Sequence, residues 1–458
     1  MQKATNKKSA LFILCLASFL VPFMGSAINL ALPQISETFS MDAISLSWIA
    51  SAFLITTAIF QVPFARLGDL IGRKKVFIIG IALFCISAFL CGLAPSGTLL
   101  IVFRAFSGLG CSMIFGTGMA ILTSIFSAEK RGMAMGINTA VVYSALATGP
   151  FIGGLITHHW GWQSLFLIVG AVGIIVVIGA ILFLKGEWIE SKGERFDYLG
   201  SVIYAIGLFG LMFGFSRLPQ PVSFVWLSLG VIAFVVFVFY ELKQAQPVFN
   251  VRIFSGNRVF ALSSLSALIN YSSTSAVAFM LSLYLRYVRG YDAQHAGLIL
   301  IVQAITQCIV SLYAGKLSDK INPSILATLG MGIGVVGLLG LIFLSPSTSL
   351  AFIIFLLTLL GLGFGLFSSP NTNVIMSSVE KKQLGQASAT MGTMRLTGQA
   401  FSMGIAMMAL SLHVGDQVIV PELHPLFMKS LHITFTVCAV LCIFGTYASS
   451  FRTRGAKQ

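Results

Sequence analysis

The chain has 458 residues, of which 57% are hydrophobic and only 9% carry a charge. Soluble domains carry about 25% charged residues, so these charges are too few to cover a soluble protein of this length, and that class is excluded. The net charge of +14 comes from short cationic groups between apolar runs, which excludes the clustered basic face of a nucleic-acid-binding protein.

The apolar runs predict a polytopic all-α membrane protein, because a span needs about 20 apolar residues. The first run follows a basic start, as in a signal peptide, but it continues past Leu32, long enough to span the membrane, and predicts an uncleaved first helix. The runs do not alternate apolar with polar residues, so they predict helices and not barrel strands. We predict 14 transmembrane helices near residues 10–32, 46–66, 76–95, 98–124, 133–157, 162–184, 198–216, 222–241, 260–285, 296–315, 323–345, 348–369, 386–412 and 428–450.

The distribution of Lys and Arg over the predicted loops indicates how the chain is oriented. An even number of spans places both termini on one side of the membrane, and 22 of the 28 cations fall on that side. Four fall on the other side, and two, Arg104 and Arg395, fall within spans. Because cytoplasmic loops carry the excess of Lys and Arg, we predict that both termini are cytoplasmic.

The first predicted helix contains the stretch MGSAINLALP, residues 24–33, in which Ser26 and Asn29 interrupt an apolar run. No carboxylate accompanies them, and all 14 acidic residues of the chain fall in predicted loops or at the ends of spans. The sequence therefore predicts no carboxylate near the middle of the bilayer. An acid there would be the simplest proton carrier and the natural counter-ion of a cationic substrate.

The stretch GDLIGRKK, residues 68–75, follows the second predicted helix. Gly68 and Gly72 allow a tight turn with close helix approach, and Asp69 is placed to cap a helix or to pair with Arg73 four residues later. Lys74 continues the cationic run. The simpler alternative is an ordinary cytoplasmic loop that carries positive charge because of its side of the membrane.

The stretch FRAFSGLG, residues 103–110, places Arg104 within the fourth predicted span, and TMRLTGQAF, residues 393–401, places Arg395 within the thirteenth. An arginine at membrane depth is costly and indicates function. The alternative is a structural arginine that extends its head group to the interface.

The stretch TGPFIGG, residues 148–154, lies in the fifth predicted span. Its Gly149, Pro150, Gly153 and Gly154 remove side-chain bulk and bend the helix, so a neighbouring helix can approach closely and pivot. The alternative is a kinked packing helix without a role in coupling.

A weak internal repeat runs through the chain. RLGDLIGRKK is echoed by GKLSDKINP, which places Asp69 and Asp319 250 residues apart, GLG at 108–110 recurs at 361–363, and EKR at 129–131 recurs as EKK at 380–382. An offset of eight helices predicts two six-helix bundles with a two-helix insert, an arrangement of transporters with a substrate site between the halves. We predict the bundles at 1–184 and 259–458 and the insert with its flanking loops at 185–258.

These motifs resemble those of the major facilitator superfamily (MFS), whose signature loop after the second helix has the pattern G-D-x-x-G-R-K. The pattern G-P-x-x-G-G in the fifth helix resembles its antiporters. RFDYLG at 195–200, LYLRYVRGYDAQHAG at 283–297 and TMRLTGQAF resemble its fourteen-helix branch, the drug:proton antiporters. The resemblance covers nearly the whole chain and implies a multi-pass protein of a prokaryotic cell membrane.

The resemblance also implies roles for particular residues. It implies a conformational-switch loop at Gly68, Asp69, Gly72, Arg73 and Lys74, and an antiporter-motif helix at Gly149, Pro150, Gly153 and Gly154. It implies that Arg104 and Arg395 are embedded charges that serve coupling, and that Met24, Ser26 and Asn29 line the cavity. In the first helix, Met24 occupies the position where that branch usually has an aspartate.

The function that we expect is secondary active export of amphipathic or aromatic small molecules by alternating access, as in multidrug efflux, with protons as the candidate coupling ion. The alternative is uptake, by uniport or symport, of a neutral or anionic aromatic solute such as a riboflavin-like vitamin. The missing acid in the first helix and the two embedded arginines favour this alternative.

A sensor, a scaffold or a membrane enzyme would need features that the sequence lacks, such as a nucleotide-binding loop, an HExxH metal motif or a large cytosolic domain. We therefore expect no enzymatic activity, no catalytic residue, no cofactor and no metal site. The expected partners are a small-molecule substrate and the lipid bilayer, with no nucleic acid, and we expect a monomer.

Overall fold

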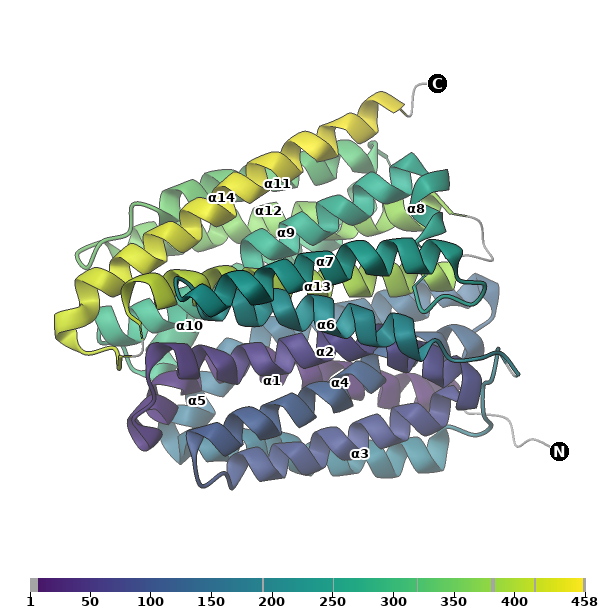
Figure 1. The fold of residues 1–458 in the computed structure, drawn as a ribbon, viewed down its shortest axis with the longest axis horizontal. Coiled ribbons are helices and arrows are strands. Elements are labelled where there is room, and N and C mark those ends of the chain that lie inside the picture. Colours follow the sequence, from purple (N-terminus) through teal and green to yellow (C-terminus); the bar gives the residue numbers. More distant parts are fainter. Residues whose placement is uncertain are drawn as a thin grey trace. The chain divides into compact units, whose positions relative to one another are not determined.

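The computed structural model describes residues 7–191, 193–249, 251–318, 320–379, 384–415 and 417–455. Over these residues the chain is helical and contains no strand (Figure 1). The helices of the first half are α1 Lys7–Phe39, α2 Ala43–Ile71, α3 Arg73–Gly92, α4 Gly97–Ile125, α5 Ala128–Phe183, α6 Tyr198–Ser216 and α7 Pro221–Lys243. Those of the second half are α8 Arg252–Gly256, α9 Arg258–Leu283, the π-helical turn η1 Tyr284–Val288, α10 Ala293–Leu317, α11 Pro323–Leu341, α12 Leu350–Ser377, α13 Leu384–His413, the 3₁₀ turn η3 Pro421–Leu423 and α14 His424–Gly455.

Within the described residues, 12 helices are long and apolar enough to cross a membrane. The predicted spans 133–157 and 162–184 both lie in α5, a helix of 56 residues that is interrupted at Gly161, whose φ of 79° and ψ of 166° are not helical. The predicted span 386–412 corresponds to α13, which has 30 residues. The chain is thus an all-α, multi-pass membrane protein.

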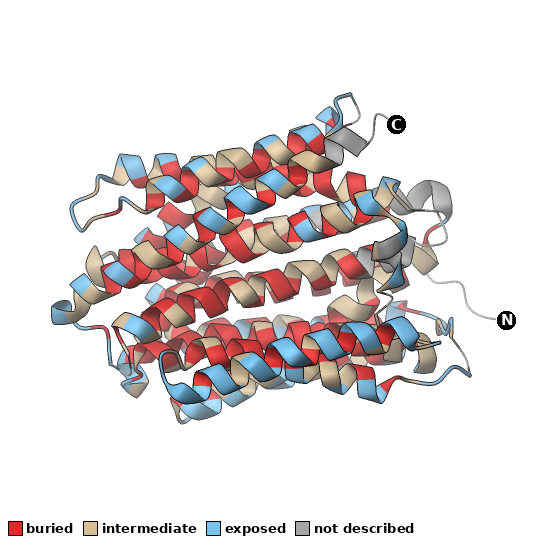
Figure 2. Cartoon of the chain, turned by 45° about the horizontal axis from the view of Figure 1, so that its top comes forward, coloured by how far each residue is buried: buried red, intermediate tan, exposed pale blue. Residues whose placement is uncertain are grey.

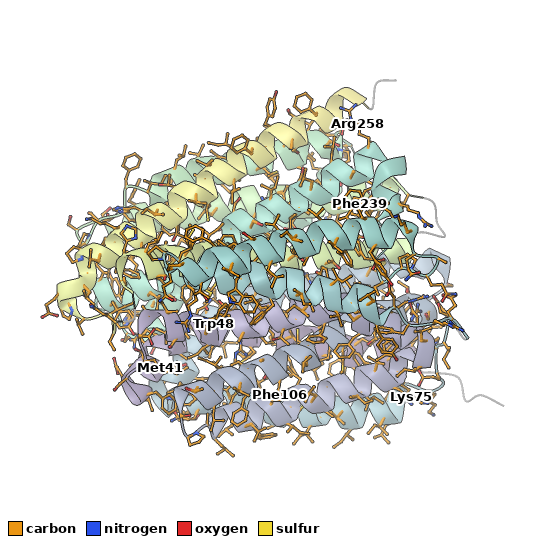
Figure 3. All side chains as sticks on the ribbon, in the orientation of Figure 1. Met41, Trp48, Lys75, Phe106, Phe239 and Arg258 are labelled. Carbon is orange, nitrogen blue, oxygen red and sulfur yellow. The ribbon has the colours of Figure 1, made fainter. Side chains whose placement is uncertain are left out.

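The helices present apolar surface to their surroundings. Figure 2 shows helices on which exposed residues follow one side and buried residues the other. The exposed sides are rich in large apolar residues: Phe106 on α4 is 45% exposed and Phe239 on α7 is 63% exposed (Figure 3). Such extensive apolar exposure is unsuited to water, and it fits helices whose outer faces contact lipid.

The chain forms two compact units. Unit 1 comprises Met1–Phe39, Trp48–Leu211 and Ser228–Phe249, and unit 2 comprises Ser40–Ser47, Met212–Leu227 and Asn250–Gln458. In unit 1, α1 packs along α5, and α3 packs against α4 and α5. In unit 2, α12 packs against α10 and α11, while α14 packs against α9 and α11 (Figure 1). The predicted division at residues 184 and 258 stays a prediction.

The internal repeat is visible as matching helix contacts inside the two units. A Cβ on Gly110 of α4 would lie 2.7 Å from the backbone oxygen of Gly80 on α3. A Cβ on Gly363 of α12 would lie 2.7 Å from the backbone oxygen of Gly330 on α11. Both pairs of helices therefore touch backbone to backbone at positions separated by about the same offset. Two other parts of the repeat, Asp319 and residues 380–382, lie outside the described residues.

Candidate functional site

The turn between α2 and α3 consists of a single residue, Gly72, with a φ of 119°. L-residues rarely adopt this conformation, whereas glycine does so without steric cost. A Cβ on Gly72 would also lie 2.5 Å from Cδ of Glu187, and one on Gly68 would lie 2.6 Å from a methyl carbon of Thr117 on α4. Both glycines of the motif loop, residues 68–75, thus stand where a side chain would collide with a neighbour.

Arg73 is the centre of the motif loop. Its side chain is only 8% exposed, and Nε donates a hydrogen bond of 2.7 Å to Asp69 Oδ1. The two terminal nitrogens donate bonds of 2.8 and 2.6 Å to the two carboxylate oxygens of Glu190, and one of them also donates 2.9 Å to Ser124 Oγ. A planar guanidinium is suited to such a two-point carboxylate contact. Asp69, Ser124 and Glu190 belong to α2, α4 and the segment after α5.

Residues 187–191 and 193–194 form an acidic segment that lies against the motif loop. The backbone N–H of Lys74 donates to Glu187 Oε1 over 2.8 Å, and that of Arg73 donates to the Trp188 oxygen over 3.0 Å. The N–H groups of Glu190 and Ser191 donate to the backbone oxygen of Asp69 over 3.2 and 3.1 Å. The segment is therefore fixed by backbone bonds as well as by charge.

Arg66, near the end of α2, extends this contact. It donates a hydrogen bond of 3.0 Å to Ser191 Oγ and forms an ion pair with Glu194. The acidic segment was not predicted from the sequence. A usable signal was present, because three of the chain's 14 acidic residues fall within the eight residues EWIESKGE, 187–194, directly after the sixth predicted span. Their charge is opposite to that of the cationic motif loop.

The glycine-rich stretch of α5 crosses α1 at its small-residue stretch. A Cβ on Gly149 would overlap the hydroxyl oxygen of Ser26, and one on Gly153 would overlap Cβ of Ala27. Ser26 donates its hydroxyl within its own helix, to the backbone oxygens of Pro22 and Phe23 over 3.0 and 3.2 Å. Two predicted motifs, distant in sequence, therefore meet at one helix crossing.

The remaining residues of these two stretches surround that crossing. Pro150 and Gly154 of α5 are buried, and Met24 of α1 is 1% exposed. Asn29 is partly exposed. On the same pair of helices, Gln34 donates a side-chain hydrogen bond of 3.2 Å to the backbone oxygen of Thr157.

Arg104 is 1% exposed and faces α2 inside unit 1. Its Nε donates a bond of 3.0 Å to the backbone oxygen of Ile49, and its guanidinium carbon lies 4.4 Å from the ring centre of Phe53. The same ring reaches α1, because a carbon of Phe53 lies 3.9 Å from a Cβ placed on Gly25. Among the described residues, none of the ion pairs includes Arg104, so a carbonyl and an aromatic face hold this cation.

Arg395 lies in α13 of unit 2 and is partly exposed. Its helix packs closely on α9 one turn later, where a Cβ on Gly398 would lie 2.6 Å from the backbone oxygen of Leu268. All seven cysteines are free, and six of them are buried. Within the described ranges, no group of three or more His, Cys, Asp or Glu residues is arranged to hold a metal ion.

Comparison with known proteins agrees with this architecture. Residues 14–403 match the family model of the Major Facilitator Superfamily. The chain is 29% identical to the riboflavin transporter RibZ of Clostridioides difficile over 88% of its own length and 87% of that protein. It is 28% identical to the multidrug resistance protein Stp of Mycobacterium tuberculosis over 85% of its length and 73% of that protein.

The fold is also found among solved structures. The inward-facing, unoccupied crystal structure of a bacterial homologue of the human lysosomal transporter Spinster superposes with a TM-score of 0.71. The match covers 98% of this chain and 97% of that one at 17% identity, so it concerns the fold alone. On the family match, the helical architecture and these relatives, the chain belongs to the Major Facilitator Superfamily and is a membrane transporter, not an enzyme.

Proposed function

We propose that this transporter exports amphipathic or aromatic small molecules by alternating access, coupled to proton antiport. The relative named for multidrug resistance supports export. The close crossing of α1 and α5 at Ser26, Ala27, Gly149 and Gly153 supports antiport, since these glycines stand in the stretch that resembles the antiporter motif. In this proposal the motif loop is the conformational switch, and Arg104 and Arg395 serve coupling.

The observation that carries the substrate class is the buried cation of Arg104, held by a carbonyl and a ring. Every acidic residue that the structure places in a helix lies within the first or last turn of that helix. Met24, at 1% exposure, fills the position where the resembling branch has an aspartate. Because no described carboxylate offsets this positive charge, we assign neutral or anionic aromatic compounds as the preferred substrates.

A second candidate function is uptake of a neutral or anionic aromatic vitamin of the riboflavin type. The 29% identity to a protein named as a riboflavin transporter favours it, and so does the substitution of Met24 for an acid. Export and uptake share the same substrate chemistry in this chain and differ in direction.

We further propose that the chain crosses the membrane 14 times with both termini in the cytoplasm of a bacterial cell. In this topology α5 crosses twice, with Gly161 at the turn, and α13 crosses once. Helices α6 and α7 form an insert between two six-helix bundles in the sequence, and Met24, Ser26 and Asn29 line the substrate cavity. The protein functions as a monomer.

The test of function is transport of riboflavin and of an uncharged dye of similar size in everted and right-side-out vesicles, each with and without a pH gradient. Accumulation in everted vesicles that collapses with the pH gradient supports proton-coupled export. Accumulation only in right-side-out vesicles favours the uptake function and excludes export. A transport rate that is the same with and without the pH gradient in both preparations excludes proton antiport.

A further inference from the structure

Two further acidic side chains are buried where α6 begins and α7 ends. Asp197 directly precedes α6 and is 7% exposed, and Glu241 lies in the last turn of α7 and is 1% exposed. Both belong to unit 1. Two residues before Glu241, Phe239 is 63% exposed on the outer side of α7 (Figure 3). This end of α7 therefore turns an aromatic ring outward and a carboxyl group inward.

One oxygen of each acid is satisfied by donors that fix the fold. Asp197 Oδ1 accepts the backbone N–H of Gly200 over 2.8 Å, as the N-cap of α6, and the hydroxyl of Tyr240 over 3.1 Å. Glu241 Oε2 accepts the backbone N–H of Phe249 over 3.4 Å, which ties the segment after α7 to that helix.

No donor among the described residues reaches the second oxygen of either acid, and both of these oxygens lie close to Gly200. Asp197 Oδ2 and Glu241 Oε1 are buried and make no hydrogen bond with any described residue. A Cβ on Gly200 would lie 2.6 Å from Asp197 Oδ2 and 2.5 Å from Glu241 Oε1. Both bare oxygens therefore lie within 2.6 Å of one point, and the absence of a side chain at Gly200 leaves that space to them.

Two ionised carboxylates in this position would repel each other, and burial strengthens that repulsion. No cation relieves it among the described ion pairs, none of which includes either acid. The neighbouring cations in sequence, Arg195 and Lys243, are exposed. A buried acceptor without a donor costs about 1–3 kcal/mol, and none of the described residues supplies a hydrogen to either bare oxygen.

The ionisable groups around the pair are few. Tyr240 touches Asp197 and is itself bonded by the Gln244 amide over 2.6 Å. Glu194, three residues before Asp197, is already paired with Arg66. A single hydrogen between Asp197 Oδ2 and Glu241 Oε1 would satisfy both oxygens and remove one of the two charges.

We propose that Asp197 and Glu241 form a proton-binding site that holds one exchangeable proton between Asp197 Oδ2 and Glu241 Oε1. The proton is taken up from solution by one carboxylate and is donated as a hydrogen bond to the other. The helix dipoles favour its residence on Glu241, because a negative charge is stabilised at the start of α6 and destabilised at the end of α7. This proton site goes beyond the proposed function, because it does not depend on which substrate the protein carries or on the direction of transport.

Infrared difference spectroscopy of the purified, full-length protein tests the site without any transport measurement. We expect one band of a protonated carboxylic acid that disappears reversibly as the pH is raised. The isosteric variants Glu241→Gln and Asp197→Asn should each lose this band. The control Glu37→Gln, which changes an exposed acid in the last turn of α1, should keep it. The titration of the unmodified protein requires no variant to fold.

Three results would overturn the proposal. The first is the absence of a titrating protonated-acid band in the unmodified protein, and the second is a band that survives in both variants. The third is loss of the band when sodium chloride replaces choline chloride at constant pH, which would identify a sodium site. A positive infrared result with no pH-dependent transport in vesicles would leave the proton site intact and reject proton antiport.

Discussion

The guanidinium of Arg73 joins three parts of unit 1, through Asp69 on α2, Ser124 on α4 and Glu190 in the acidic segment. The bond to Glu190 uses both terminal nitrogens. Such a fork depends on the planar shape of the guanidinium as well as on its charge. In the proposed function this contact acts as a latch, because it would have to open before α2 and α4 could separate from the segment.

Replacement of Arg73 by lysine tests this latch. A lysine keeps the charge but cannot bond Asp69, Ser124 and both oxygens of Glu190 together, so we expect the transport rate to fall about tenfold or more, which corresponds to about 1.4 kcal/mol. Asp69→Asn, which removes the charge that pairs with Arg73, should lower the transport rate similarly and leave insertion into the membrane unchanged. The measurement is the initial transport rate per inserted protein. Lys75→Ala, which removes an exposed cation of the same loop, is the control, and an equal loss there would point to loop charge alone.

The buried positive charge of Arg104 leads to a prediction about the charge of the substrate. Two unit charges about 8 Å apart at an effective dielectric constant of about 20 interact by roughly 2 kcal/mol. A permanent cation placed at that distance from Arg104 would therefore bind more than tenfold more weakly than a neutral analogue. We expect poor ethidium transport beside good transport of a neutral flavin-like dye.

The variant Met24→Asp provides the reciprocal test of this charge argument. An acid at the buried position of Met24 should raise ethidium transport relative to the neutral dye. Met24→Asn is the matched control, because it adds polarity without charge. Strong ethidium transport by the unmodified protein would contradict the charge argument.

The crossing of α1 and α5 is the element-scale counterpart of these single-residue contacts. Helices that approach backbone to backbone need small residues at the contact. Gly149 and Gly153 meet this need opposite Ser26 and Ala27. Because neither glycine leaves room for a Cβ, the separation of the two helices is fixed within narrow limits.

The double variant Gly153→Ala with Ala27→Gly tests the crossing. Gly153→Ala alone inserts a methyl group against Cβ of Ala27, and overpacking of this kind costs about 1–3 kcal/mol. We expect a lower unfolding temperature and slower transport, with partial recovery when Ala27→Gly removes the opposing Cβ. Gly136→Ala on the same helix, where a Cβ would meet nothing within 4 Å, should be neutral. Failure of the second substitution to restore either property would place the defect elsewhere.

Much of the element pattern could be predicted from hydrophobicity, and the differences have physical causes. The predicted span 46–66 underestimates α2, Ala43–Ile71, because the helix continues through polar and charged residues after the apolar run ends. The Asp69–Arg73 pair follows from helical spacing. Glu190 could not be assigned to Arg73 in this way, because it is 117 residues away in the chain and only the packing of α5 brings it near. The burial of Glu241 could not be predicted either, because it also depends on how distant parts of the chain pack together.

At the scale of the whole molecule, the number of membrane crossings remains a prediction that labelling can test. If α5 crosses twice, residues on either side of its second half lie on opposite sides of the membrane. His159 and Arg195 are both exposed. A membrane-impermeant maleimide should label His159→Cys but not Arg195→Cys in intact cells, and should label both after permeabilisation. Labelling of both in intact cells would contradict the 14-helix topology.

The distance in sequence between Arg73 and Glu190 also has a consequence for synthesis. Chains grow at about 5–20 residues per second, so the 117 residues between these partners take roughly 6 to 23 seconds to appear. During that interval the cations of the motif loop have no partner from the acidic segment, while the next helices enter the membrane. Positive loops are the ones held back from translocation. In the predicted topology the cationic loop therefore orients α2 and α3 before Glu190 is synthesised, and the ion pairs with the acidic segment form only afterwards.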